Sequence, residues 1–333
     1  MMKALQLTRP HLSAATPPVL SLTTLPTPIL KPGYALVKIH FSSIHPSDKL
    51  NSKGSFPITT YPRIPGRDYS GTVLDIASES EKSWIGKAVY GSSGATLGFE
   101  IDGPHAEFCL VPEEALVEKP STLSFLQAAT VGVPYTTAYL TLKRARTTKD
   151  DVVLVLGANG AVGSSAVQIA RAIGCKRVLT ATRREAGDTP DVDLTSGIPE
   201  TVLRSTIPAL TDGRGVDVII DTVGSIALMS AAIKHLARCG RYSWIAAPRG
   251  GVSTDLTFDI FQAYRDEIEL VGCNTGNYSV TEVAQDMRVL KEWFDSGIIK
   301  SRDEGVFEII DLDNAVEKGY GGEAGKLIVV ALV

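Results

Sequence analysis

The stretch VVLVLGANGAVG, residues 152–163, decides how the middle of this chain folds. Val152–Leu156 is an unbroken apolar run of the kind that forms a strand buried in a parallel sheet. Glycines follow at 157, 160 and 163, and helical spacing of apolar residues then runs over Ser164–Ile173, with Gly174 as the predicted stop. Glycines allow a tight turn and let the backbone approach a pyrophosphate, which the N–H groups at a helix N-terminus bind. The stretch therefore predicts a dinucleotide site that includes Gly157, Asn159, Gly160, Ala161, Val162 and Gly163.

The spacing of this loop leaves a second interpretation open. It is G-x-x-G-x-x-G, whereas the usual fingerprint is G-x-G-x-x-G, so a tight strand–helix turn without a ligand is the alternative. Further strands are predicted at Asp217–Ile220 and Arg241–Ala246, with a helix over Ala227–Ala237 between them. Strands that alternate with helices indicate an α/β, doubly wound parallel sheet, which favours the dinucleotide site.

The predicted strand Arg177–Ala181 bears on which dinucleotide fits. A carboxylate at its end would bind the ribose hydroxyls of NAD, but the first acid is Glu185. Thr182, Arg183 and Arg184 come before it. A hydroxyl followed by two guanidiniums suits a 2′-phosphate, because Arg binds phosphate in fork geometry. We therefore predict NADPH as the cofactor, and a solvated loop with two surface arginines is the alternative.

The chain on either side of this α/β region is different in character. Before residue 120, short apolar runs separated by Pro, Gly and Ser predict an all-β segment. The runs are Ala35–Phe41, Gly71–Ile76, Ala88–Tyr90 and Ala106–Val111. After residue 266 the pattern is mixed, with a helix predicted over Val280–Phe294 and strands over Phe307–Ile310 and Lys326–Leu332. A length of 333 residues fits two domains better than one.

Composition excludes several classes of function. The net charge is -4 and the pI about 5.8, so nothing favours nucleic acid or an anionic membrane. No run approaches the roughly 18 apolar residues of a membrane span, and the N-terminus has no signal-peptide pattern. The four cysteines are scattered (Cys109, Cys175, Cys239 and Cys273), so they predict no structural zinc lobe and a reducing, cytoplasmic location.

Seven segments in order resemble one family, the zinc-free quinone and enone reductases of the medium-chain dehydrogenase/reductase superfamily. VKIHFSSIHPSD (37–48) is similar to the family's strand followed by G-V-N-P-x-D, and IPGRDYSGTV (64–73) to its P-G-x-D-x-x-G-x-V. GPHAEFCLVP (103–112) is similar to G-A-Y-A-E-Y-x-x-V-P. The other four segments are LSFLQAATVGVPYTTAY (123–139), GVDVIIDTVGS (215–225), CGRYSWIA (239–246) and GKLIVV (325–330).

The resemblance implies a fold and a place for the cofactor. It implies a GroES-like β-barrel catalytic domain over residues 1–122, completed by 266–333, and a Rossmann NADPH-binding domain over 123–265, with cofactor and substrate in a cleft. Thr137 would face the nicotinamide. Val223, Gly224, Ile245 and Ala246 would line the cofactor. A homodimer through the Rossmann domain is a further expectation, with the region 241–246 as a candidate edge strand. Relatives place a helix after Arg184, but residues 185–194 contain a Pro and four acids, so we predict no full helix there.

The same resemblance bears on catalysis. Zinc-dependent relatives bind the metal through a Cys, a His and a second Cys, and the matching positions here are His45, Arg67 and Val133. One ligand does not hold zinc, so we expect no metal. Zinc-free relatives usually carry Asn at the position of His45, and their substrate-binding Tyr is matched by Leu50 and Phe56. His45 is therefore the candidate catalytic donor, since its ordinary pKa near 6.5 allows it to give a proton. The alternative is that His45 only orders its loop or the cofactor ribose.

These expectations favour an NADPH-dependent reductase that transfers hydride to a small-molecule quinone or α,β-unsaturated carbonyl without zinc. Two other functions stay open. One is a trans-acting enoyl-thioester reductase of fatty-acid or polyketide biosynthesis, and the other is a cofactor-binding protein that has lost its activity. Neither nucleic acid nor a membrane is an expected partner.

Overall fold

The computed structural model describes residues 1–9, 16–183, 189–322 and 326–332. The chain forms two compact units, a first unit of Met1–Thr136 with Thr275–Val333 and a second unit of Thr137–Asn274. These bounds differ from the domain limits of 122 and 265 expected from the sequence. The later limit moves because a strand at Glu269–Gly272 pairs with the sheet of the second unit. Among the described residues, no helix has the length and apolar character to cross a membrane.

The second unit is a doubly wound α/β fold. Its sheet has the order β12-β11-β10-β7-β8-β9, and each neighbouring pair is parallel. The chain thus starts in the middle, winds outward to β9, and then returns to build the other half, as in dinucleotide-binding sheets. The strands are β7 (Val152–Leu156), β8 (Arg177–Thr182), β9 (Val192–Asp193), β10 (Val216–Asp221), β11 (Leu236–Trp244) and β12 (Glu269–Gly272). The predicted fold class is confirmed in this unit.

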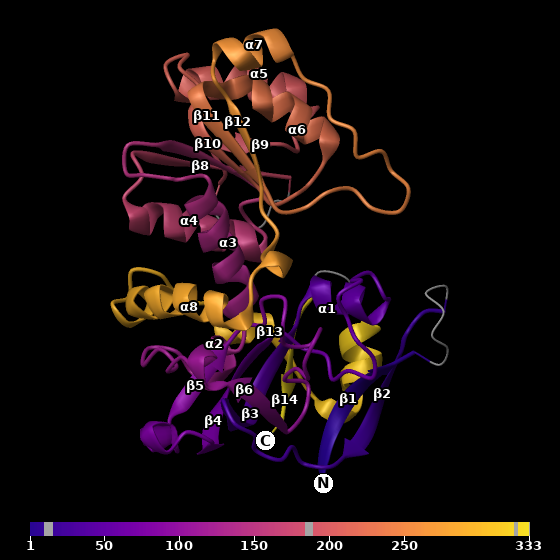
Figure 1. Ribbon diagram of the computed structural model, residues 1–333. Coiled ribbons are helices and arrows are strands. Elements are labelled where there is room, and N and C mark those ends of the chain that lie inside the picture. The colour runs from indigo at the N-terminus through magenta and orange to yellow at the C-terminus, as the bar shows by residue number, and fades with distance from the viewer. Residues whose placement is uncertain (10–15, 184–188, 323–325, 333) are drawn as a thin grey trace. The chain divides into compact units, whose positions relative to one another are not determined.

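Helices cover both faces of this sheet, with α4 on one side and α5 and α6 on the other (Figure 1). They are α3 (Gly132–Arg144, which begins in the first unit), α4 (Ala161–Ile173), α5 (Pro199–Leu210), α6 (Ile226–Ala232) and α7 (Ile260–Arg265). A buried cluster joins alternate β7 side chains, such as Leu154, to Leu203 of α5. Gly174 ends α4 as predicted, because its φ of 83° is a left-handed conformation that glycine adopts at little cost.

Two features of the second unit differ from the expectation. The predicted edge strand at 241–246 is wrong, since β11 lies between β10 and β12 and ends at Trp244. The strand at the edge is β12. It is only four residues long, which is too short to show the alternation of apolar and polar residues that predicts a strand. Any pairing of two copies through an exposed edge at this end of the sheet would therefore use β12. Helix α5 also lacked a prediction, and it contains Pro208 in its last turn.

The first unit is built on a six-stranded, mostly antiparallel sheet. Its order is β13-β14-β3-β4-β5, with β6 also paired to β3, and β1 and β2 form a separate hairpin. The strands are β1 (Met2–Thr8), β2 (Val19–Leu25), β3 (Tyr34–Ile44), β4 (Asp68–Ile76), β5 (Ala88–Gly91), β6 (Phe108–Pro112), β13 (Phe307–Asp311) and β14 (Leu327–Ala331). The helices are α1 (Pro46–Ser52), α2 (Phe125–Ala128) and α8 (Val280–Asp295). Strand β3 is central because it pairs with β4, β6 and β14, and the site described below begins at its end.

Candidate functional site

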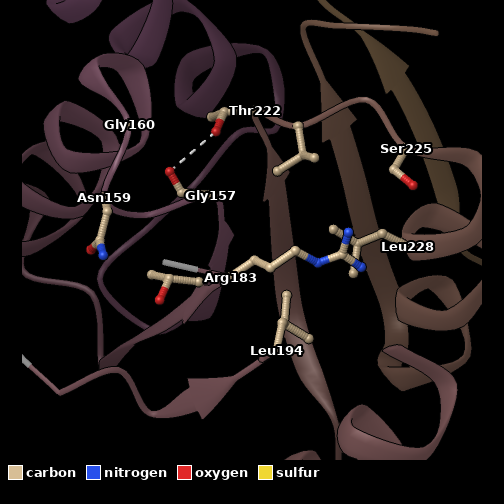
Figure 2. A pocket seen from close by; sticks show the side chains of 10 residues that line it. Gly157, Asn159, Gly160, Arg183, Leu194, Thr222, Ser225 and Leu228 are labelled. Carbon is tan, nitrogen blue, oxygen red and sulfur yellow. Dashed lines mark hydrogen bonds between the residues drawn. The ribbon is translucent and has the colours of Figure 1, made fainter. Parts of the chain in front are cut away.

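A pocket of about 350 Å³ lies at the carboxyl ends of the parallel strands of the second unit (Figure 2). Parallel α/β sheets bind ligands at this edge, where the strand order reverses. Six predicted residues line the pocket: Gly157, Asn159, Gly160, Thr182, Arg183 and Val223. The sequence did not predict the other four: Leu194, Thr222, Ser225 and Leu228. Thr222 and Ser225 flank the predicted pair Val223 and Gly224, whereas Leu194 and Leu228 are apolar residues whose type gives no chemical sign of a cofactor.

The glycine loop approaches its surroundings so closely that side chains do not fit. Gly157 has a φ of 78°, and a Cβ there would lie 2.6 Å from Thr222 Oγ1. A Cβ on Gly163, in the first turn of α4 with Ala161 and Val162, would lie 2.1 Å from the carbonyl oxygen of Gly157. The loop therefore presents backbone to the pocket at the N-terminus of α4, where the first N–H groups lack intrahelical acceptors. This is the cradle that a dinucleotide pyrophosphate needs.

A buried carboxylate holds the turn after β10, which forms the part of the pocket wall beside Gly157. Asp221, at the end of β10, has no solvent exposure, and its Oδ1 accepts hydrogen bonds from the N–H groups of Val223 (2.8 Å) and Gly224 (3.1 Å). Tyr242 donates its hydroxyl to Oδ2 at 3.0 Å. Burial raises the pKa of Asp221, and the three hydrogen bonds oppose that change. Asp221 therefore fixes the turn that carries Val223 into the pocket. Asp221 was not predicted, and the signal that could have identified it is an acid at the end of the apolar run VIID.

The remaining predicted cofactor residues lie at different distances from the pocket. Gly224 packs against Ala246, since a Cβ on Gly224 would lie 2.5 Å from the Ala246 carbonyl carbon. Ile245 donates its N–H to the Asp221 carbonyl at 3.2 Å, so both residues after β11 stand beside the turn after β10. Thr137 is a nearly buried residue of α3 and does not line the pocket. Arg184 lies outside the described residues.

Of the described residues that line this pocket, Arg183 is the one that carries a charge. It follows β8 directly, is exposed, and extends its side chain across the pocket toward the side of Leu228 (Figure 2). Within the described part of the chain its guanidinium makes no hydrogen bond or ion pair. No carboxylate belongs to a described residue that lines the pocket, so within that part of the chain the guanidinium is available to an anionic ligand.

In the first unit, His45 stands where β3 gives way to α1. Its backbone N–H donates to Asp48 Oδ2 at 2.7 Å, and the Asp48 N–H donates back to the His45 carbonyl at 2.9 Å. Pro46 occupies the first helical position, where a missing N–H costs nothing. This reciprocal cap holds the backbone of His45, and its side chain is 12% exposed.

The imidazole of His45 has two hydrogen-bond partners at its Nε2 atom. Its Nε2 lies 2.7 Å from Asp68 Oδ2 and 2.8 Å from Ser43 Oγ. Asp68 has no solvent exposure, and the same Oδ2 also accepts the N–H of Val133 at 2.6 Å. Burial by itself lowers the pKa of His45, but the carboxylates of Asp68 and Asp48 outweigh it and raise that pKa above its ordinary value. Sequence patterns assigned no role to Asp68, although it stands in the segment IPGRDYSGTV.

The three positions compared with zinc ligands lie beside one buried carboxylate, that of Asp68. His45 and Val133 converge on Asp68, and the neighbouring Arg67 buries its guanidinium, with Nε donating to Ser93 Oγ at 2.8 Å and Nη1 to Ser47 Oγ at 3.0 Å. Of the residues that the structure describes, no three His, Cys, Asp or Glu side chains are grouped as metal ligands. A buried cation beside a single imidazole does not fit a catalytic zinc, which takes three protein ligands.

Comparison with known proteins identifies the family. The family model for the alcohol dehydrogenase GroES-like domain matches residues 31–121, and that for zinc-binding dehydrogenase matches 161–292. A zinc-type alcohol dehydrogenase-like protein of Schizosaccharomyces pombe is 42% identical over 297 residues, which cover 89% of this chain and 87% of that protein. The quinone oxidoreductase of Homo sapiens is 30% identical over 68% of each chain.

Solved structures agree on the fold. An alcohol dehydrogenase superfamily protein from Novosphingobium aromaticivorans superposes with a TM-score of 0.81 at 26% identity, covering 99% of both chains. A putative zinc-binding dehydrogenase from Sinorhizobium meliloti, bound to NADP, gives 0.80 at 22% identity, also over 99% of both. These matches confirm the GroES-like and Rossmann architecture. The chain belongs to the medium-chain dehydrogenase/reductase superfamily and is an oxidoreductase of that family.

Proposed function

We propose that the protein is an NADPH-dependent reductase that transfers hydride to a quinone or an α,β-unsaturated carbonyl without zinc. The observation that carries this proposal is the guanidinium of Arg183, which crosses a dinucleotide pocket whose described lining residues include no carboxylate. The 2′-phosphate of NADPH would give this cation a negatively charged partner, whereas NADH has only hydroxyl groups at that place. Neighbours of this fold are known with either cofactor, NADP in the Sinorhizobium meliloti protein and NADH in an Escherichia coli dehydrogenase, so the choice rests on Arg183.

The residues divide the work of binding. Backbone groups of Gly157 and Gly160, with the N-terminus of α4, would hold the pyrophosphate, and Thr182 and Arg183 the adenosine phosphate. Val223, Gly224, Ile245 and Ala246 would border the cofactor at the strand ends, and Thr137 would approach the nicotinamide. When bound, NADPH supplies a hydride from C4 of its nicotinamide. The chain's own task is then to stabilise the charge that develops on the substrate oxygen.

His45 is the proposed donor for that oxygen. Its partly exposed imidazole is held rigidly, and Leu50 and Phe56, at the positions of the family's phenol, have no group to donate. A reductase of this kind needs no Lewis acid, because a hydrogen bond or proton from an imidazole performs the same polarisation. The pairing of His45 with Asp68 beside the buried Arg67 supports a mechanism without zinc.

The experiment is a substrate panel. Purified protein is mixed with NADPH or NADH and with quinones, simple enones and enoyl thioesters, and cofactor oxidation is followed by absorbance. The proposal predicts NADPH oxidation with quinones or enones. Turnover confined to enoyl thioesters would instead assign the protein to thioester reduction. Tight NADPH binding without turnover of any of the three classes would indicate a cofactor-binding protein without reductase activity.

A further inference from the structure

One short segment of the second unit supplies a large part of the pocket wall. The lining residues Thr222, Val223, Ser225 and Leu228 come directly after β10, in a turn and in the first turn of α6 (Figure 2). We call residues 221–224 the β10 turn. The side chain of Val223 is 48% exposed, so the turn presents an apolar group to the pocket. The position of the β10 turn therefore sets the shape of the site on this side.

Two sets of hydrogen bonds hold the β10 turn. On the side of the glycine loop, the Thr222 hydroxyl donates to the Leu156 carbonyl at 2.8 Å. On the side of the sheet, the N–H groups of Val223 and Gly224 both donate to Oδ1 of Asp221, at 2.8 and 3.1 Å. Two consecutive backbone donors thus converge on one carboxylate oxygen. A displaced carboxylate would release both of them, and the turn would lose its support from the sheet.

The carboxylate of Asp221 is buried without a cation beside it. It has no solvent exposure, and none of the described Lys, Arg or His residues forms an ion pair with it. Its charge is stabilised by three donors, of which two belong to the β10 turn. The third is the hydroxyl of Tyr242 on the neighbouring strand β11, which donates to Oδ2 at 3.0 Å. A buried charge that lacks a counter-ion depends strongly on each of its hydrogen bonds.

Tyr242 has the properties of a permanent donor. Its side chain is fully buried, and burial beside the Asp221 carboxylate raises the pKa of the phenol far above its ordinary value. The hydroxyl therefore keeps its hydrogen at every pH at which the protein is folded. Tyr242 does not line the pocket, so its hydroxyl is not placed to bind a ligand.

We propose that Tyr242 is a positioning residue of the cofactor site, which acts through Asp221 to hold the β10 turn in the form that receives the dinucleotide. This inference rests on the proposed function and adds a residue behind the pocket wall to it. Thr182 and Arg183, rather than the β10 turn, are the residues proposed to distinguish the two cofactors. Loss of the Tyr242 hydroxyl should therefore weaken the binding of NADPH and NADH alike.

Tyr242→Phe removes the hydroxyl and keeps the ring. Tyr90→Phe is the matched control, because Tyr90 is also buried and donates to the Met287 carbonyl at 2.8 Å in the first unit. Each variant loses one buried hydrogen bond, so both should have a lower melting temperature. Only Tyr242→Phe should raise the Kd values of NADPH and NADH, each by about fivefold or more in calorimetric titrations. Kd values that match those of the unmodified protein would overturn the proposal, whatever the melting temperature.

A double-mutant cycle tests whether Tyr242 acts through Asp221. In Asp221→Asn the amide carbonyl can still accept from Val223 and Gly224, but the charge is lost. Once the carboxylate is gone, removal of the phenol should matter little. The double variant should therefore bind NADPH within about twofold of Asp221→Asn alone. If the fold-changes in Kd of the two single variants multiply in the double variant, the residues act independently and the proposal is wrong.

Hydrogen exchange of the free protein reports on the β10 turn without any cofactor. Exchange at the Val223 and Gly224 amides, followed by mass spectrometry, should be about fivefold faster or more in Tyr242→Phe and unchanged in Tyr90→Phe. Unchanged exchange in Tyr242→Phe would contradict the link between the phenol and the turn. A protein that prefers NADH contradicts the cofactor assignment, yet an equal loss for both cofactors would still support Tyr242. A protein that binds neither dinucleotide contradicts the proposed function and this inference with it, and exchange then judges the link to the turn alone.

Discussion

Arg183 makes a prediction at the scale of a single residue. Its guanidinium has no described partner and crosses the pocket, so a 2′-phosphate is its expected ligand. A hydrogen bond to a charged group contributes about 1.5–3 kcal/mol, so Arg183→Ala should raise the NADPH KM by about tenfold or more, and the double change with Arg184 at least as much. The NADH KM should change little. Arg204→Ala, at an exposed position of α5 away from the pocket, is the control. Equal KM values for NADPH and NADH in the unmodified protein would contradict the cofactor assignment.

His45 makes the second residue-scale prediction. If it donates to the reacting carbonyl, His45→Ala should lower kcat by about 10²-fold or more, in line with the loss of one positioned donor. His45→Asn should keep much of the activity, because an amide donates a hydrogen bond without moving a proton. Measuring kcat and the melting temperature of both variants together separates catalysis from loop order. Full kcat in the Ala variant, with only the melting temperature lowered, would remove His45 from the mechanism.

At the scale of elements, the glycine loop and the first turn of α4 form one structure, in which two glycines have different roles. Gly163 is needed for packing, since its Cβ would overlap the Gly157 carbonyl oxygen. Gly160 faces the pocket, and its Cβ would lie at 3.3 Å from the same oxygen, which a small shift accommodates. The two glycines therefore serve the fold and the ligand respectively.

Two alanine variants test that division. Gly163→Ala should destabilise the protein by about 1–3 kcal/mol, which is typical of overpacking, and should lower the melting temperature with and without cofactor. Gly160→Ala should leave the melting temperature of the free protein nearly unchanged and weaken NADPH binding, because the added methyl group stands where the pyrophosphate approaches. Thermal melts with and without NADPH provide both readouts. If Gly163→Ala has the melting temperature of the unmodified protein, the loop and the helix do not lie as close together as described here.

The elements also show where sequence patterns are informative. The strand β7, the loop and α4 follow from a buried apolar run, spaced glycines and helical periodicity, and each of these is a local signal. Strand β12 escaped prediction because four residues give no period, and α5 because Pro208 stands where a helix interior disfavours it. In both cases tertiary packing decides a conformation that local sequence does not specify.

The candidate site divides in the same way. The loop glycines and Arg183 were predicted because their residue types have a direct chemical meaning for phosphate. Asp68 and Asp221 were missed because each acts through partners far away in sequence, such as Val133 for Asp68 and Tyr242 for Asp221. An acid in an apolar segment is a signal of a buried role, but it does not say which donors it meets.

At the scale of the whole molecule, the account makes a prediction about metal. The family includes zinc-dependent members, yet His45, Arg67 and Val133 do not supply the three ligands of a catalytic zinc. Elemental analysis should find well below one zinc ion per chain, and chelators should leave NADPH-dependent turnover intact. Stoichiometric zinc together with chelator-sensitive turnover would mean that this comparison of positions is wrong.

The central claim is that hydride passes from NADPH to the β-carbon of an electron-poor acceptor without a metal. The most direct measurement is a single turnover of chelator-treated protein with an enone and NADPH deuterated at nicotinamide C4, in each of its two stereospecific forms. The account predicts that one of the two forms transfers a deuterium to the β-carbon of the saturated ketone, as read by mass spectrometry and NMR. A ketone without deuterium from either form, or turnover that appears only after zinc is added, would contradict it.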